Sequence, residues 1–376
     1  MPGLAGALLV CLALLVLSKR VRFPPIPFYI GAGLVLGEAG LGLVAADEIS
    51  AFLARIGLLF LLFSMGLQLR PDQIRIRGSS FAAAGIIDCA VNIPLGFIGG
   101  LALGIPIYEA LLIAAAFYIS SSAMAVASLI ENKKLFLAEA ETVVWLMVFE
   151  DIVLVLFVAL FSSTGQGAVS VFARTAVVVA ACFLVVRYGR QALISLLSRE
   201  DEVPLVFSFS AVIGAAWLAG MLGVPETLLV IALGSALSQT VPGVLEAQIR
   251  PFRDVFLIVF FVFFGITIDF AGIPPLPALV ALAVLALLSK LLSGALIGRV
   301  VHRRAGSGVE IWSHTAARGE FSIALAAVFG SAAVSGTVAA LVVITSLCGA
   351  LLGKYGTALF PRALRNVSDS HRSGRP

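Results

Sequence analysis

Long apolar stretches follow one another along almost the whole chain, and this feature constrains its fold more than any other. About 20 apolar residues cross the roughly 30 Å hydrocarbon core of a bilayer. Hydrophobic residues make up 60% of the 376 residues and charged residues only 12%, whereas a soluble domain carries about 25% charged residues. The chain is therefore expected to be an all-α polytopic membrane protein. Breaks between the apolar stretches predict spans at residues 2–18, 24–43, 50–69, 79–103, 107–130, 138–161, 168–187, 203–221, 225–240, 251–270, 275–298, 309–335 and 337–353, with a split at Gly336.

The basic residues support this division into thirteen spans. Lys and Arg gather after the odd-numbered spans, as at Arg75 and Arg77 after span 3 and at Lys133 and Lys134 after span 5. The segments after the even-numbered spans hold almost none. Basic loops stay in the cytoplasm, so we expect the N-terminus outside and the C-terminus inside, in the plasma membrane.

The two halves of the chain resemble each other at an offset of about 198 residues. FLLFSMGLQL (60–69) resembles VFFVFFGITI (259–268), and IPFYIGAGLVLG (26–37) resembles VPETLLVIALG (224–234). Seven spans separate the copies, and because seven is odd the halves must have opposite orientations in the membrane. Inverted repeats are typical of secondary transporters. The predicted organisation is a first repeat at 1–161, a linker span with a surface helix at 162–202, a second repeat at 203–353 and a disordered cytoplasmic tail at 354–376.

Two adjacent acids, Glu150 and Asp151, lie at the centre of the sixth span. An unpaired carboxylate at that depth costs at least about 2.5–3.5 kcal/mol, and intramembrane acids usually mark a functional site. The two residues are therefore predicted to bind a cation or a proton. The alternative is an ion pair that only joins helices.

Three further charges are expected at a similar depth in two other spans. Lys290 lies about 15 residues into span 11, and Arg318 and Glu320 lie about 10 residues into span 12, at 1.5 Å per residue. Buried charges pair with one another. We therefore expect Lys290 to pair with Glu150 or Asp151, and Arg318 to pair with Glu320 or another acid.

Two spans are predicted to be interrupted. Three consecutive hydroxyls lie at the centre of span 5, namely Ser120, Ser121 and Ser122. In span 12, Gly319 separates Arg318 from Glu320, and the repeat offset superposes Arg318 on Ser120. Two interrupted helices at corresponding positions are the best sequence indication of a transporter site. Alternatively, the serines allow two helices to pack closely.

The same offset places Lys290 on Asn92 of span 4, with Asp88 one turn away. Both are further candidates for the site, and the alternative for Asp88 is a position that faces the loop. His314, in span 12, is either a proton acceptor or an interfacial packing residue. The sequence has no phosphate loop, no nucleophile set and no zinc motif, and its four cysteines form no CxxC pair. It therefore predicts no cofactor, no metal beyond a transported cation and no enzymatic activity.

Together these segments resemble the membrane domain of monovalent cation:proton antiporters, in particular the Kef-type potassium:proton exchangers and their sodium:proton relatives. The motifs that carry the resemblance are LVLGEAGLGLV, GLLFLLFSMGLQL, SSSA, FEDI, FFVFFGITIDF and ARGEFSIALA. The resemblance implies crossed, discontinuous helices 5 and 12, and a homodimer in which spans 4–6 and 11–13 move against a scaffold. It also implies that Asp151 is the ion-binding aspartate and that Lys290 is the lysine beside it. Glu150 departs from the Asp, Asn or Gln that is usual in the family.

The expected function is exchange of K⁺ or Na⁺ for protons by elevator-type alternating access, in pH and cation homeostasis. Kef-type proteins also carry a nucleotide-binding domain, but this sequence has no GxGxxG segment. We therefore expect that domain to be absent or to be a separate cytoplasmic subunit. No nucleic-acid partner is expected. Two alternatives remain: an organic-anion symporter of the same architecture, and a membrane sensor that transports nothing.

Overall fold

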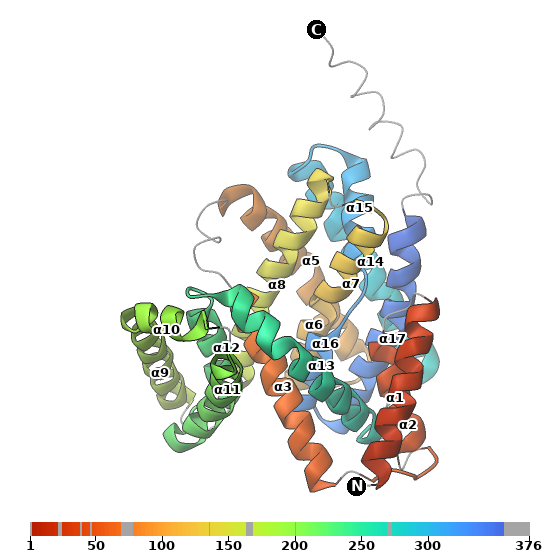
Figure 1. The fold of residues 1–376 in the computed structure, drawn as a ribbon. Helices are drawn as coiled ribbons and strands as arrows, with labels where there is room; N and C mark the ends of the chain where they lie inside the picture. The colour runs from red at the N-terminus through yellow and green to blue at the C-terminus, as the bar shows by residue number, and fades with distance from the viewer. Residues whose placement is uncertain are drawn as a thin grey trace. The chain divides into compact units, whose positions relative to one another are not determined.

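The computed structural model describes residues 2–21, 25–37, 40–45, 47–68, 78–134, 136–162, 168–199, 201–268 and 273–356. Sixteen helices are found in these segments (Figure 1). The predicted disordered tail lies outside the described residues from position 357 onward. The helices are α1 (Pro2–Val21), α2 (Ile26–Leu36), α3 (Glu48–Gln68), α5 (Gly78–Ala102), α6 (Ile107–Tyr118), α7 (Ser122–Glu131), α8 (Ala138–Ser162), α9 (Ala168–Tyr188), α10 (Arg190–Leu197), α11 (Val203–Leu222), α12 (Glu226–Leu237), α13 (Pro242–Ile266), α14 (Leu276–Val300), α15 (Ala305–Thr315), α16 (Glu320–Phe329) and α17 (Ala332–Tyr355).

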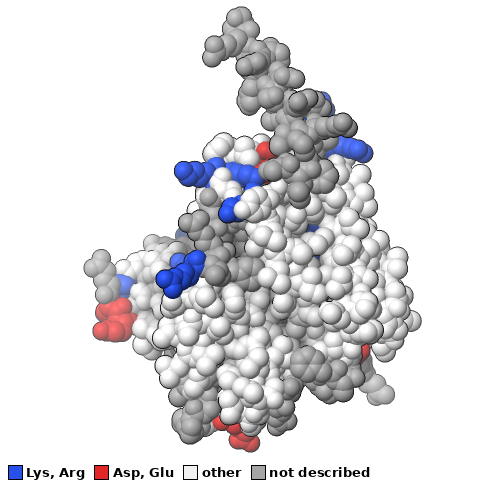
Figure 2. Space-filling model, turned by 90° about the vertical axis from the view of Figure 1, so that its right-hand side faces the viewer, with Lys and Arg blue, Asp and Glu red and all other residues white. Residues whose placement is uncertain are grey.

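Many of these helices are suited to a bilayer. Six are long and apolar enough to cross it alone, and a seventh span results if α9 and α10, which are bent by 70°, count together. Large apolar side chains face outward, as at Leu9, Val177 and Trp217, each at least 66% exposed. On the face in Figure 2, charged side chains form only small groups. Such a surface is favourable in lipid and unfavourable in water.

Most predicted spans coincide with helices, but the split at Gly336 is wrong. The chain breaks instead at Gly330 and Ser331, and the Ser331 hydroxyl accepts a hydrogen bond from the amide of Val334 and caps α17. Gly336 lies inside α17, where the side chain of Ile273 packs against it. Helix α13 also begins nine residues before the predicted span, because its first turns are too polar to stand out as an apolar stretch.

The chain forms two compact units, of which the first comprises Met1–Cys11, Ala32–Ile76 and Asp151–Ile266. Glycines allow close helix contacts within it. A Cβ atom on Gly66 of α3 would lie 2.9 Å from the Cα atom of Gly234 in α12. A Cβ atom on Gly33 of α2 would lie at the same distance from the Cα atom of Gly265 in α13. Small residues permit this approach between membrane helices.

The second unit comprises Leu12–Gly31, Arg77–Glu150 and Thr267–Pro376. It contains both interrupted helices, α6 with α7 and α15 with α16, together with α5, α14, α17 and the first half of α8. A buried apolar cluster that includes Leu129, Val143, Leu146 and Ile311 packs α7, α8 and α15 together. The polar residues of the two interruptions are buried as well, with Ser120, Ser121 and Arg318 at most 3% exposed.

Candidate functional site

The two helix interruptions of the second unit meet. Helix α6 ends at Tyr118 and α7 begins at Ser122, while α15 ends at Thr315 and α16 begins at Glu320. The amide of Ser121 donates a hydrogen bond of 2.8 Å to the carbonyl oxygen of Ala317. Gly319 is needed at this crossing, because a Cβ atom there would lie 2.6 Å from the Cβ atom of Ser121. Backbone groups freed by one break thus find partners in the other, as they must inside a bilayer.

The Arg318 side chain neutralises helix ends at this crossing. It is fully buried. Its guanidinium donates to the backbone carbonyl oxygens of Phe117 (2.5 Å), Ala316 (3.0 Å), Ala286 (3.2 Å) and Thr315 (3.3 Å). Carbonyl groups at the C-termini of α6 and α15 carry partial negative charge, which a cation stabilises. Arg318 therefore holds the interruption together through the backbone.

Glu150 provides the opposite charge at the start of α7. One of its carboxylate oxygens accepts a hydrogen bond from the backbone amide of Ser120, and the other accepts one of 3.0 Å from the Ser120 hydroxyl. The same hydroxyl lies 3.0 Å from the carbonyl oxygen of Thr315. The backbone amide and the hydroxyl of Ser120 thus give the buried Glu150 carboxylate hydrogen-bond partners in place of water.

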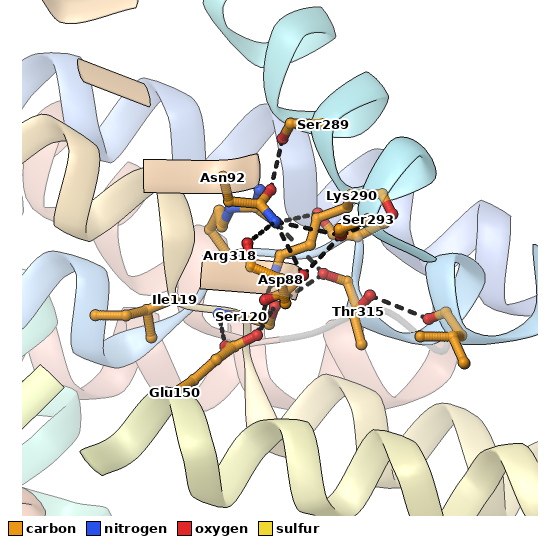
Figure 3. A network of polar contacts seen from close by, with 12 residues as sticks. Asp88, Asn92, Ile119, Ser120, Glu150, Ser289, Lys290, Ser293, Thr315 and Arg318 are labelled. Carbon is orange, nitrogen blue, oxygen red and sulfur yellow. Dashed lines mark hydrogen bonds and ion pairs between the residues drawn. The ribbon is translucent and has the colours of Figure 1, made fainter. Parts of the chain in front are cut away.

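Lys290 of α14 lies between two carboxylates (Figure 3). Its ammonium nitrogen is 2.7 Å from an oxygen of Glu150 and 2.6 Å from an oxygen of Asp88 in α5. All three residues are at most 1% exposed. The ring of Tyr118 lies below the ammonium, with 5.2 Å between the nitrogen and the ring centroid. A buried ion pair requires such additional partners to offset its desolvation.

Asp88 is itself fixed by α5 and α14. Its second oxygen accepts hydrogen bonds from the Asn92 amide (2.9 Å) and from the Ser293 hydroxyl (2.7 Å). The Ser289 hydroxyl donates to the Asn92 side-chain oxygen over 2.7 Å. Three helices, α5, α8 and α14, and Ser120 in the interruption between α6 and α7 thus contribute to one network of charges and hydroxyls around Lys290.

Asp151 follows Glu150 on α8 and is 5% exposed. The other predicted polar residues line the crossing: the Ser121 hydroxyl donates to Glu320 over 3.4 Å, and Ser122 is half-buried at the start of α7. Within the described part of the chain, no three His, Cys, Asp or Glu side chains form a group able to hold a metal ion. The arrangement suits reversible binding of protons and monovalent cations.

Comparison with known proteins shows the family of the chain. Residues 6–360 match the family model of the sodium/hydrogen exchanger transmembrane domain. The chain belongs to the sodium/hydrogen exchanger family. It is 30% identical to the K⁺/H⁺ antiporter subunit KhtU of Bacillus subtilis, over 96% of this chain and 93% of KhtU. It is 26% identical to the ammonium/H⁺ antiporter subunit AmhT of Alkalihalophilus pseudofirmus, over 94% and 92% of the two chains.

The fold is shared with a solved exchanger. The structure of the sodium–proton antiporter MjNhaP1 from Methanocaldococcus jannaschii superposes with a TM-score of 0.70 at 17% identity, over 97% of this chain and 99% of that one. As an exchanger of this family, the protein is an integral membrane transporter and not an enzyme, and it exchanges a monovalent cation for protons. The family match favours cation exchange over organic-anion symport and over a purely sensory role.

The sequence predicted part of this exchanger's polar network. Of the two acids offered to Lys290, Glu150 lies 2.7 Å from its ammonium nitrogen, and both interruptions are present. Arg318 was expected to contact an acid, whereas its guanidinium donates to backbone carbonyls. Asp88, which the sequence left open between the site and the loop, contacts the ammonium of Lys290 directly. Ser289 and Ser293 were missed, although both lie within one turn of Lys290.

A second polar cluster joins α7 to α15. The carboxylate of Glu310 lies 2.5 Å from the Lys134 ammonium and 3.2 Å from a ring nitrogen of His314. The other ring nitrogen of His314 lies 2.9 Å from the Ser128 hydroxyl. His314, a candidate proton acceptor in the sequence, thus lies in a network of its own, built from residues other than those around Lys290.

Proposed function

We propose that Asp151 is the carboxylate that binds the transported cation or a proton, one at a time. The observation that carries this proposal is the position of Asp151, buried on α8 directly after Glu150, which is fixed by Lys290 and Ser120. Each ion must leave before the other binds, so competition alone couples the two fluxes. Glu150 tunes this carboxylate through its charge.

The transported cation is proposed to be K⁺ or Na⁺. KhtU is named a K⁺/H⁺ antiporter subunit, and GerN of Bacillus cereus, 29% identical over 82% of this chain and 82% of GerN, is named a Na⁺/H⁺-K⁺ antiporter. The chemistry of the site is compatible with both, because a carboxylate with nearby hydroxyl and carbonyl oxygens offers the hard oxygen ligands that alkali cations prefer.

Transport is proposed to follow an elevator cycle in a thirteen-span protein with two inverted repeats. The paired interruptions and the paired glycine contacts support the repeats: Gly66 and Gly265, equivalent in the two halves, each approach a glycine of the other half. The division of the chain into two compact units supports movement of one unit as a body. The N-terminus would face outward and the C-terminus the cytoplasm of the cell, in the plasma membrane.

The exchanger is further proposed to be a homodimer that works with a separate cytoplasmic regulatory subunit. Both KhtU and AmhT are named as antiporter subunits, which supports a multi-component assembly. Copurification of the full chain with proteins encoded beside it, followed by native mass spectrometry, measures the assembly.

Replacement of Asp151 tests the proposed site. Purified protein is reconstituted in liposomes, and proton movement is recorded on addition of Na⁺, K⁺, Li⁺ or NH₄⁺, with and without an imposed voltage. Asp151→Asn is expected to lose exchange, by at least about 100-fold, because an amide cannot exchange a proton for a cation. Asp254→Asn, the same substitution at an exposed carboxylate, is the matched control. Full pH-dependent exchange in Asp151→Asn would contradict the proposed role of Asp151 in ion binding.

A further inference from the structure

Helix α17 provides two hydroxyl groups to the interruption between α15 and α16. The backbone amide of Arg318 donates a hydrogen bond of 3.2 Å to the hydroxyl oxygen of Thr345. The Ser346 hydroxyl donates one of 3.0 Å to the backbone carbonyl oxygen of Arg318. All three residues are at most 2% exposed. Both backbone groups of Arg318, which no helix satisfies, thus find partners in α17, as they must inside a bilayer.

The direction of both hydrogen bonds is fixed. The Thr345 hydroxyl donates its own hydrogen over 2.7 Å to the carbonyl oxygen of Leu341, one turn earlier in α17. Its oxygen can therefore accept from the amide of Arg318, which can only donate. The carbonyl oxygen of Arg318 can only accept, so the bond to it must come from the Ser346 hydroxyl. An apolar side chain at either position would leave one of these groups without this partner.

A glycine allows α17 to approach the interruption closely. Gly349 lies one turn after Thr345 and Ser346, and a Cβ atom on it would lie 2.7 Å from the Cβ atom of Ala317. The carbonyl oxygen of Ala317 accepts the hydrogen bond from Ser121 that joins the two interruptions. Small residues permit such contacts between membrane helices. Helix α17 is therefore the surface against which Ala317 and Arg318 lie.

The first half of the chain contains a similar contact made by a different side chain. The repeat offset aligns Ser120 with Arg318. Helix α8 follows the first interruption and α17 follows the second. The amide of Ser120 donates to Glu150 of α8, and the amide of Arg318 donates to Thr345 of α17. The next helix along the chain thus holds each interruption at the aligned residue, with a carboxylate in one case and with neutral hydroxyls in the other.

The backbone position of Arg318 determines which groups its side chain reaches. The guanidinium donates to carbonyl oxygens at the ends of α6 and α15, and that of Thr315 is one of them. The same carbonyl oxygen lies 3.0 Å from the Ser120 hydroxyl, which contacts Glu150 (Figure 3). A shift of the Arg318 backbone would therefore displace the polar groups that surround Glu150.

We propose that Thr345 and Ser346 are positioning residues of the exchanger, which act on the cation-binding site through Arg318. Their hydroxyls hold the segment between α15 and α16 so that the Arg318 side chain stays on the helix ends. The affinity of the site for the cation depends on this position, although neither hydroxyl contacts the ion. This inference rests on the proposed function of the acids on α8.

The cation concentration dependence of exchange separates this role from a purely structural one. Thr345→Val keeps the branched shape of the side chain and removes the hydroxyl. In liposomes at a fixed pH, its apparent KM for K⁺ or Na⁺ is expected to rise about fivefold, the equivalent of one lost hydrogen bond. The maximal rate per folded protein is expected to stay near that of wild type. Thr345→Ser keeps the hydroxyl and is expected to restore the wild-type KM.

Another threonine of the same helix provides the matched control. Thr337 is as completely buried as Thr345, and within the described residues its hydroxyl donates to the carbonyl oxygen of Ala333 in α17 itself. Thr337→Val is therefore expected to leave the KM unchanged. An equal rise of the KM in Thr337→Val, or a raised KM in Thr345→Ser, would overturn the inference.

Ser346→Ala tests the second hydroxyl and is expected to raise the KM by a similar factor. A lower maximal rate with an unchanged KM in the Thr345→Val and Ser346→Ala variants would mean that the hydroxyls only stabilise the fold, and would overturn the inference. If one of these variants does not fold, the KM of the other decides. Failure of the proposed function would show differently, as wild-type protein without exchange or as Asp151→Asn with full exchange.

Discussion

At the scale of single residues, His302 links the stability of the exchanger to pH. It lies in the turn after α14, and its ring nitrogen is 2.8 Å from the Thr142 hydroxyl of α8. Burial lowers the pKa of His302 below its usual 6.5, while Glu139 opposes this effect. A base whose pKa is lowered on folding stays neutral down to a lower pH in the folded state than in the unfolded state. Its contribution to stability is therefore present above pH 6.5 and is lost as the pH falls through the lowered pKa.

The measurement is the melting temperature in detergent at pH 7.5 and at pH 5. The melting temperature of wild-type protein is expected to decrease more on acidification than that of His302→Gln. In this variant the amide keeps a hydrogen bond to Thr142 without titrating. Thr142→Val, which removes the partner and leaves the histidine, serves as a comparison with the pH dependence retained. Equal losses in wild type and His302→Gln would contradict this assignment.

The individual charges show what a sequence can and cannot predict here. The depths of Glu150 and Lys290 in the membrane follow from counting residues along the helices, so their pairing could be predicted. Asp88 was ambiguous, because the sequence does not show which face of α5 turns toward α14. Arg318 was assigned an acidic partner because buried charges usually pair. The carbonyls that bind it exist only once two helices end beside it.

At the scale of elements, the crossing of the two interrupted helices depends on Gly319. A Cβ atom there would lie 2.6 Å from both the Cβ atom and the hydroxyl oxygen of Ser121. Gly319→Ala is therefore expected to force the interruptions apart, with a loss of about 1–3 kcal/mol of stability and most of the exchange activity. Both are measured in the same preparation, by thermal unfolding and by proton flux.

Gly214→Ala provides a matched control for this substitution. Gly214 lies inside α11, and a Cβ atom there meets nothing within 4 Å. Since alanine is favoured over glycine in helix interiors by about 1 kcal/mol, this variant is expected to be at least as stable as wild type and fully active. Similar losses at both positions would mean that crowding at the crossing is not the cause.

The interruptions were predictable from sequence, whereas other helix ends were not. Three serines and the Arg-Gly-Glu segment stood at equivalent places in two halves, so each supported the other. The break before α17 lacked such a counterpart. Glycine was taken as the stop signal at Gly336, but in a membrane helix a glycine often provides room for a neighbour, here Ile273. The signal that was missed is Ser331, a capping residue.

At the scale of the whole molecule, the repeat and the loop charges imply one topology. An odd number of spans between the halves requires opposite orientations, and the basic loops assign the cytoplasmic side. The contact between Gly33 and Gly265 and the contact between Gly66 and Gly234 each join a helix of one half to a helix of the other. The inverted arrangement stays a prediction, because sequence similarity between the halves is weak.

Two exposed apolar residues allow this topology to be measured. Phe136, 83% exposed, lies in the basic segment after α7, and Ile107, 71% exposed, is the first residue of α6. In a background with the four cysteines replaced by alanine, Phe136→Cys is expected to react with a membrane-impermeant maleimide only in inside-out vesicles. Ile107→Cys is expected to react only in right-side-out vesicles. Because only the interrupted α6 and α7 separate the two positions, reaction from the same side would mean that this pair does not cross the membrane, and the inverted arrangement would fail with it.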